Sequence, residues 1–232
     1  MNYHCSAIGI YAAASMLAVF LVAGQSWGAT GRDLLNNGAL DRGSGDSVDG
    51  WRIDAWILTP GTTEYHWTRP QKGRPGQVNV FSHLDNDARW VQSVSLGPGW
   101  YYISTEVSTR NVQQVHTGAN VSVLEDGIMS QDLRGSNAWK PLGFYLKIGQ
   151  RGADVDIALR LGSYMNLTRG EAIFRMPSVK RVAIPPPGSS RVFDLDQIRQ
   201  GEARGPIGRP WTLAVTYLLL ATVCAVGWLL LS

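Results

Sequence analysis

The sequence predicts an all-β protein built around one antiparallel β-sandwich. Between residues 36 and 184, apolar and polar residues alternate in short runs, which is the pattern of half-buried strands. Gly, Pro, Asn and Asp separate these runs at turns such as 97–99, 125–127 and 149–152. Eight or more short strands at this spacing, with no helical period, are typical of a sandwich of two sheets.

The strands can be placed one by one from this alternation. The first is expected at 51–57, where only Trp56 breaks the pattern and should therefore face away from its apolar neighbours. The next is expected at 63–68, with Tyr65 and Trp67 on one face. Further strands are expected at 78–81, 90–96, 101–107, 119–124, 142–148, 155–161 and 172–174.

Both ends of the chain differ from this middle region. Three prolines open a polar stretch, 185–210, which we expect to form a stalk in which 192–200 can form a short helix beginning near Asp194. The last run, 211–231 (Trp211 to Leu231), has no charged side chain. At about 1.5 Å per residue it can cross a hydrocarbon layer of about 30 Å, so it predicts a transmembrane helix.

The N-terminal segment, 1–29, contains a second hydrophobic stretch followed by small residues at which a signal peptidase can cut. We interpret it as a secretory signal, with an uncleaved anchor as the alternative. Either interpretation exports the predicted sandwich, 30–184, to the periplasmic or extracellular face of a membrane.

Composition excludes some classes of function. All 21 Lys and Arg and all 18 Asp and Glu fall between Arg32 and Arg209, with the two signs interspersed and a net charge of +3. This balance argues against a nucleic-acid partner. Both cysteines, Cys5 and Cys224, lie in the hydrophobic end segments, so the sandwich must fold without a disulfide.

A catalytic arrangement is not evident. Asp154 and Asp156 are the nearest approach to a carboxylate pair, but their place in the alternation predicts a solvated strand face. The histidines lack metal-binding spacing, and no Gly-x-Ser-x-Gly motif or phosphate-binding loop is present. We expect a protein that is not an enzyme.

Three phrases in the middle region recur in a known family. They are Leu-Asn-Asn-Gly-Ala-Leu-Asp-Arg-Gly at 35–43 with a following Gly-Trp, the pair of runs at 91–104, and the closing hairpins from Trp139 to Phe174. In this order they resemble the galactose-binding-like jelly roll of secreted carbohydrate-binding modules, over about residues 36–184. The resemblance implies a jelly-roll sandwich that binds sugars.

The resemblance also implies a structural calcium ion, for which Asp41 would be a ligand. Phe174 is followed by Arg-Met-Pro-Ser, which adds no acid, so the alternative for Asp41 is a turn or surface role. No other cofactor is expected.

Aromatic residues supply the main chemical signal. The chain has nine Trp and eight Tyr, and sugars stack their C–H faces on such rings while nearby polar groups bond to the hydroxyls. For Trp51, Tyr101 and Trp139 we expect a place in the core. The predicted ligand-binding residues are Trp56, Tyr65, Trp67, Arg69, Trp90 and Gln92.

Two hypotheses for function follow. The first is a membrane-anchored, exported carbohydrate-binding module that recognises an envelope or extracellular glycan without catalysis. The alternative is an accessory or docking subunit of a membrane complex for envelope polysaccharide synthesis, glycosyl transfer or export, whose partner would be a membrane protein. Small residues within 211–231 would suit close helix packing in such a complex. A groove with polar rims would favour the glycan, and a flat apolar patch the protein partner.

Overall fold

The computed structural model describes residues 31–203, which form a β-sandwich, and this confirms the predicted all-β class. The predicted signal segment, 1–29, and the predicted transmembrane run, 211–231, lie outside the described residues. Within 31–203, no helix combines the length and the apolar character that crossing a bilayer would need.

Two sheets and one small hairpin make up the fold. The six-stranded sheet has the order β13 (Val192–Asp194), β10 (Gly135–Ile148), β7 (Gly99–Val112), β12 (Thr168–Val182), β5 (Gln77–Asn86), β4 (Thr63–Thr68). The five-stranded sheet has the order β3 (Arg52–Ala55), β6 (Ala88–Leu96), β11 (Ala153–Leu161), β8 (Ala119–Val123), β9 (Ile128–Met129). The hairpin joins β1 (Gly43–Ser44) to β2 (Ser47–Val48). All pairings are antiparallel except that of β13 with β10.

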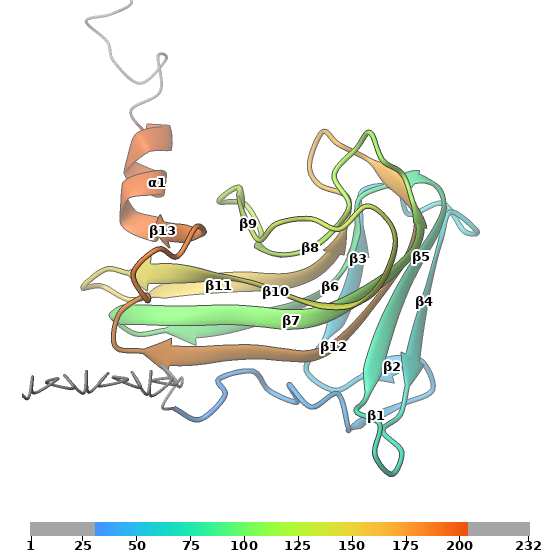
Figure 1. Ribbon diagram of the computed structural model, residues 1–232, viewed down its shortest axis with the longest axis horizontal. Helices are drawn as coiled ribbons and strands as arrows, with labels where there is room; N and C mark the ends of the chain where they lie inside the picture. Colours follow the sequence, from blue (N-terminus) through green and yellow to red (C-terminus); the bar gives the residue numbers. More distant parts are fainter. Residues whose placement is uncertain (1–30, 204–232) are drawn as a thin grey trace, which may run out of the picture.

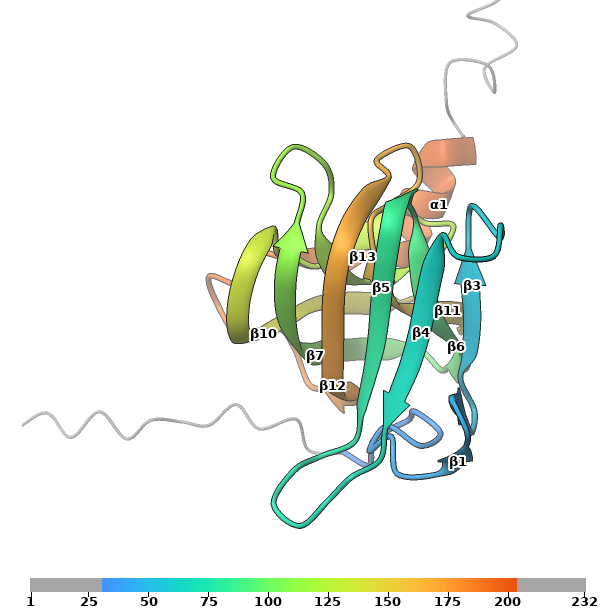
Figure 2. The ribbon, with the colours of Figure 1, turned by 90° about the vertical axis from the view of Figure 1, so that its right-hand side faces the viewer.

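The two sheets lie face to face. Figure 1 shows the long strands β7, β10 and β12 curving towards β5 and β4, and Figure 2 shows these five strands side by side with β6 and β11 behind them. The chain passes from one sheet to the other at Asp87, which alone separates β5 from β6. Strands that change sheets in this way form the corners of a sandwich.

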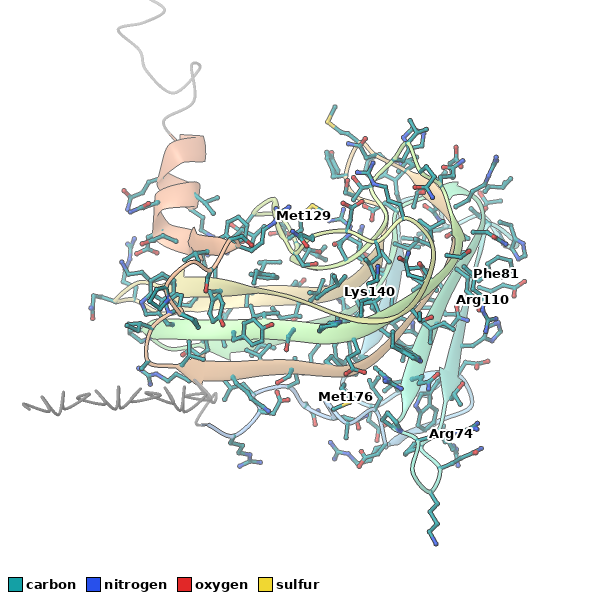
Figure 3. All side chains as sticks on the ribbon, in the orientation of Figure 1. Arg74, Phe81, Arg110, Met129, Lys140 and Met176 are labelled. Atoms are coloured by element: carbon teal, nitrogen blue, oxygen red, sulfur yellow. The ribbon has the colours of Figure 1, made fainter. Side chains whose placement is uncertain are left out.

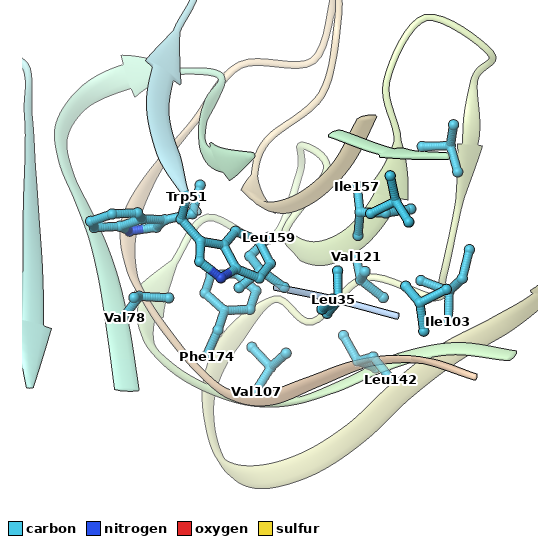
Figure 4. Close-up of a cluster of buried hydrophobic side chains, with 14 of the residues drawn as sticks. Leu35, Trp51, Val78, Ile103, Val107, Val121, Leu142, Ile157, Leu159 and Phe174 are labelled. Carbon is cyan, nitrogen blue, oxygen red and sulfur yellow. The ribbon is translucent and has the colours of Figure 1, made fainter. Parts of the chain in front are cut away.

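Alternation along the strands builds the core. In β7 every second residue from Tyr101 to Thr109 is buried, and the facing strand β11 buries Val155, Ile157 and Leu159. Figure 4 shows Ile103 and Val107 of β7 meeting Ile157 and Leu159 of β11 between the sheets. Residues such as Phe81 and Arg110 project from the other side of the six-stranded sheet, where Figure 3 labels them. Each sheet therefore has one inner and one outer face.

Several strands are longer than the alternation predicts, among them β10 and β12. The strand β10 begins at Gly135 because its first half pairs with β7 through irregular register, and it includes Pro141, which hides a strand in the sequence. The strand β12 continues past Pro177 through a bulge between Arg175 and Ser178, where Met176 has a φ of 52°.

The predicted stalk needs a correction, because its middle part belongs to the sandwich. The strand β13 pairs with β10, and the helix α1 (Leu195–Ala203) follows it directly and buries Leu195 completely. The carboxylate of Asp194 accepts a bond of 3.3 Å from the Gln197 N–H at the start of the helix. Arg199 then binds the buried Asp126 through two bonds of 2.7 and 2.9 Å. The polarity of this segment reflects its position at an edge. The buried Leu195 and the partly buried Phe193 and Ile198 attach it to the core, together with the Arg199–Asp126 pair.

Replacing Leu195 tests this attachment. We expect Leu195→Ala to lower the free energy of unfolding by about 2–5 kcal/mol, because it empties a buried site. The neighbouring exposed change Gln197→Ala is the control and should leave stability within about 0.5 kcal/mol. Equal denaturation midpoints for the two variants would show that the helix is not part of the cooperative fold.

Candidate functional site

A groove of about 490 Å³ crosses the outer face of the five-stranded sheet. Its floor comes from outward-facing residues of three strands, and its wall comes from the turn between β8 and β9. The lining residues are Arg52, Asp54, Trp56, Arg89, Val123, Leu124, Glu125, Gly127, Asp156, Arg160 and Tyr164. The groove is thus mixed in character, with a charged floor and an aromatic end.

Two exposed aromatic rings form that end. Trp56 is 58% exposed and Tyr164 is 67% exposed, and their ring centroids lie 5.3 Å apart at an angle of 85°. A second hollow of about 260 Å³, also lined by Asp87, Met165 and Leu167, shares both rings. The pair therefore stands between two hollows with much of its surface open to solvent.

The backbone on each side of this aromatic pair is fixed. The Trp56 N–H donates to the Asp87 carbonyl at 2.9 Å, and the buried Asn86 side chain bonds both backbone groups of Ile57 at 2.9 and 3.0 Å. Tyr164 lies in a turn closed by reciprocal bonds of 3.1 and 3.0 Å between Ser163 and Asn166. Rigid loops are the usual way in which sheets present binding residues.

A buried ion cluster underlies the groove. The fully buried Asp87 accepts two bonds of 2.6 and 2.5 Å from Arg160 and one of 2.7 Å from Arg89. Arg89 also donates at 2.8 and 2.6 Å to Asp54. Burial alone would lower the pKa of Arg89, but the charges of Asp87 and Asp54 outweigh burial and raise it. The floor is therefore a fixed network of ion pairs.

The acids on this face already have partners. Asp156 accepts from Arg52 at 2.6 Å and from Ser93 at 2.5 Å, and the exposed Asp154 accepts from Ser95 at 2.5 Å. These carboxylates lie on the predicted solvent face, as structural surface acids. Nothing in this arrangement resembles a paired general acid and base.

The structure separates the six predicted ligand-binding residues. Only Trp56 borders the groove as an exposed ring. Trp67 and Trp90 are buried, and their indole N–H groups donate to the carbonyls of Leu40 at 2.9 Å and Asn79 at 3.1 Å. Gln92 is 5% exposed and bonds the backbone of Asn36 and Gly50 at 2.6, 2.7 and 2.9 Å. These three side chains face the core, and we leave them out of the site.

Tyr65, Arg69 and Asp41 also lie away from the groove. The Tyr65 hydroxyl donates to the Asp54 carbonyl at 2.7 Å, and its ring packs edge-on against Trp90. Arg69 lies over the Trp67 ring at 5.0 Å. Asp41 is exposed beside Arg42, 3.8 Å away, and residues 31–203 contain no cluster of three or more side chains suited to a metal ion. The expected calcium site therefore gains no support from this part of the chain.

Sequence reasoning on the other aromatic residues was partly right. Trp51 and Tyr101 are in the core, as predicted. Trp139 is only half-buried, and the Arg175 guanidinium stacks 4.0 Å from its ring centroid. Tyr164 was missed, although its position in a turn between two strand runs favours an exposed ring.

No family model and no curated protein matches the sequence. Among solved structures, the chain is similar to a bacteriophage CBA120 tailspike protein 4 domain (TM-score 0.47, 8% identity, 65% of this chain, 21% of that chain). It is also similar to a putative sugar-binding protein from Bacteroides thetaiotaomicron, with a TM-score of 0.45, 11% identity, and coverage of 65% of this chain and 100% of that one. A third similar structure is TmCBM61 in complex with β-1,4-galactotriose, with a TM-score of 0.44, 14% identity, and coverage of 65% of this chain and 99% of that one. The chain thus matches about a fifth of the tailspike domain and nearly all of the other two. Such likeness assigns no function.

Removing Asp87 from the buried ion cluster should destabilise the fold. We expect Asp87→Ala to lower the free energy of unfolding by about 3–5 kcal/mol, because it leaves two guanidinium groups without their buried counter-ion. The exposed Asp85, 4.0 Å from Arg169, provides the control Asp85→Ala, with an expected change below about 1 kcal/mol. Chemical denaturation measures both, and a similar small loss in each would contradict the role given to Asp87.

Tyr65 should make the free energy of unfolding fall as the pH rises into the alkaline range. Burial raises the pKa of Tyr65 to about 12, against about 10 in an unfolded chain. Because the folded pKa is the higher, this contribution is complete below pH 10 and disappears as the pH rises towards 12. The free energy of unfolding of the wild type should therefore fall more steeply over this interval than that of Tyr65→Phe. Parallel curves would show that the phenol is not protected.

Proposed function

We propose that this domain binds a glycan chain, without catalysing a reaction, in the groove on the outer face of the five-stranded sheet. The observation that carries the proposal is the exposed pair Trp56 and Tyr164 between two hollows. A free-standing aromatic surface at the end of a polar groove suits the alternation of C–H faces and hydroxyls on a sugar.

The size and charge of the groove support a neutral or weakly charged saccharide. Its volume of about 490 Å³ falls within the range of about 300–1,000 Å³ that is usual for small-molecule sites. The guanidinium groups of Arg89 and Arg160 are neutralised by Asp54 and Asp87, so they offer orientation more than net charge. Arg52, 52% exposed at its side chain, and its partner Asp156 can bond hydroxyls from the rim.

Membrane anchoring completes the proposal. We propose that 211–231 holds the exported domain at a bilayer surface, which the length and apolar composition of that run support. A shallow site of this kind binds weakly, and many copies on one surface would raise the effective concentration.

A docking role is the alternative function. Met165 and Leu58 are 87% and 78% exposed, and Met165 borders the hollow next to the aromatic pair. Exposed apolar residues of this kind also occur where proteins meet. The charged floor and rim of the groove favour the glycan, because a protein contact would have to desolvate them.

Trp56 provides the decisive test. The full-length chain is titrated calorimetrically with β-1,4-galactotriose, xylohexaose and a β-1,3-1,4-mixed-linked tetrasaccharide, in a detergent that has no sugar headgroup. We expect at least one saccharide to bind and the double change Trp56→Ala, Tyr164→Ala to weaken it at least tenfold, about 1.4 kcal/mol or more. Trp56→Phe keeps a ring and should lose less.

All variants must have the melting temperature of the wild type before their affinities are compared. Saccharide binding that is unchanged in the double variant would remove this groove from the proposal. Failure of every saccharide to bind the wild type would contradict glycan binding, and a protein captured through this patch would then support the docking subunit.

A further inference from the structure

A second aromatic site lies on the opposite side of the sandwich. Tyr102 on β7 and Tyr145 on β10 are register partners on the outer face of the six-stranded sheet, with ring centroids 4.7 Å apart at 33°. A Cβ atom at position 143 would lie within 2.8 Å of the Tyr102 hydroxyl. Because Gly143 has no side chain, the Tyr102 ring has room to lie against it. The two rings pack against each other in a tilted stack, whose exposed side forms a surface across neighbouring strands.

Hollows flank this surface on both sides and share Tyr102, Pro141 and Tyr145. One, of about 340 Å³, is also lined by Gln131, Ser189 and Arg191, and the other, of about 510 Å³, by Ser104, Ser178 and Lys180. Met176, labelled in Figure 3 beside β12, also lines the larger one. We call the two hollows together the tyrosine trough.

The trough has a built wall. Ile184 and Pro186 line one hollow and Ser189 to Arg191 line the other, so the chain between β12 and β13 borders both. The Ser189 N–H and hydroxyl both donate to the Pro186 carbonyl, at 3.2 and 2.7 Å. The Tyr145 N–H donates to the Arg191 carbonyl at 2.8 Å, which ties the far end of this wall to β10. The segment predicted as a stalk is therefore a fixed border of the trough.

The tyrosine hydroxyls are free for a ligand. Tyr65 and Tyr101 donate theirs to backbone carbonyls at 2.7 and 2.8 Å, whereas within residues 31–203 Tyr102 and Tyr145 have no such partner. Burial, together with the neighbouring Tyr145, raises the pKa of Tyr102, so it stays a neutral donor at physiological pH. Polar groups left unused next to an open aromatic surface are typical of ligand sites.

We propose that the tyrosine trough binds an extended oligosaccharide, with one sugar ring on the exposed side of the tyrosine pair and its neighbours in the two hollows. The exposed side of the ring pair can stack on a sugar. Hydroxyl groups in both hollows, with the Gln131 amide in the smaller one, suit a chain that repeats its hydroxyls. Lys180 and Glu106 line the larger hollow, and Arg191 lines the smaller one. Glu106 is already paired with Arg175 at 2.6 Å, so the trough carries a small excess of positive charge, which suits a neutral or weakly acidic chain. With the groove on the other sheet, one domain would hold two glycan chains on opposite faces.

The site stands independently of the Trp56 groove and is tested separately. The full-length chain, again in a detergent without a sugar headgroup, is titrated with xylohexaose and with the mixed-linked tetrasaccharide. The background is Trp56→Ala, Tyr164→Ala, in which the first groove is disabled. We expect saturable binding that Tyr145→Ala weakens at least tenfold, while Tyr145→Phe weakens it about twofold to fivefold by removing only the hydroxyl.

The measurement distinguishes the two proposals. Binding that is retained in the Trp56 background and lost with Tyr145→Ala supports the trough, whatever happens in the groove. A wild type that binds one saccharide per chain, with all binding lost in the Trp56 background, would overturn the trough and leave the groove. Binding of decaproline, but of neither saccharide, that Tyr145→Ala abolishes would also overturn it, in favour of a peptide groove. Matched melting temperatures of the Tyr145 variants exclude misfolding as the cause.

Discussion

The corner between the two sheets, at Asn86 and Asp87, is the constraint on which the structure depends. Both residues are completely buried where the chain leaves β5 and enters β6, and each carries a polar side chain that must be satisfied. Asn86 bonds the chain at Ile57 and the Thr63 hydroxyl, and Asp87 binds two arginines. A buried ion cluster adds little net stability over apolar packing, but its hydrogen bonds constrain the groups around it. The corner thereby fixes how the sheets meet.

The same corner gives the groove its aromatic end. The Asp87 carbonyl holds the Trp56 N–H, and the Asp87 carboxylate orients the arginines of the floor, so the ring and the charges are positioned by one residue. Core packing is satisfied by Trp90, Phe144 and Phe174, which are almost fully buried. The core does not need Trp56 and Tyr164, and both rings remain at the surface. Large rings that the fold does not need to bury are the ones available to a ligand.

Alternation predicted the strands but could not identify the inner face of each one. Tyr65 and Trp67 do share a face, as do Trp90 and Gln92, but in both strands that face is the core. In a sequence, a polar residue such as Gln92 predicts the outer face of a strand. Here its amide is buried instead, because it forms hydrogen bonds with backbone groups of Asn36 and Gly50. The groove also needs partners distant in sequence, such as Asp87 with Arg160, and a single sequence does not reveal such pairing.

The docked helix limits where this domain can stand. Leu195 and the Arg199–Asp126 pair hold α1, which ends at Ala203, against the sandwich. Under the proposed anchoring, residues 204–210 then span at most about 25 Å to the bilayer. If both proposals hold, so short a tether would restrict the domain to glycans lying close to the membrane. The groove and the tyrosine trough lie on opposite sheets, so under this tether two glycan chains held at once would run on opposite sides of the domain.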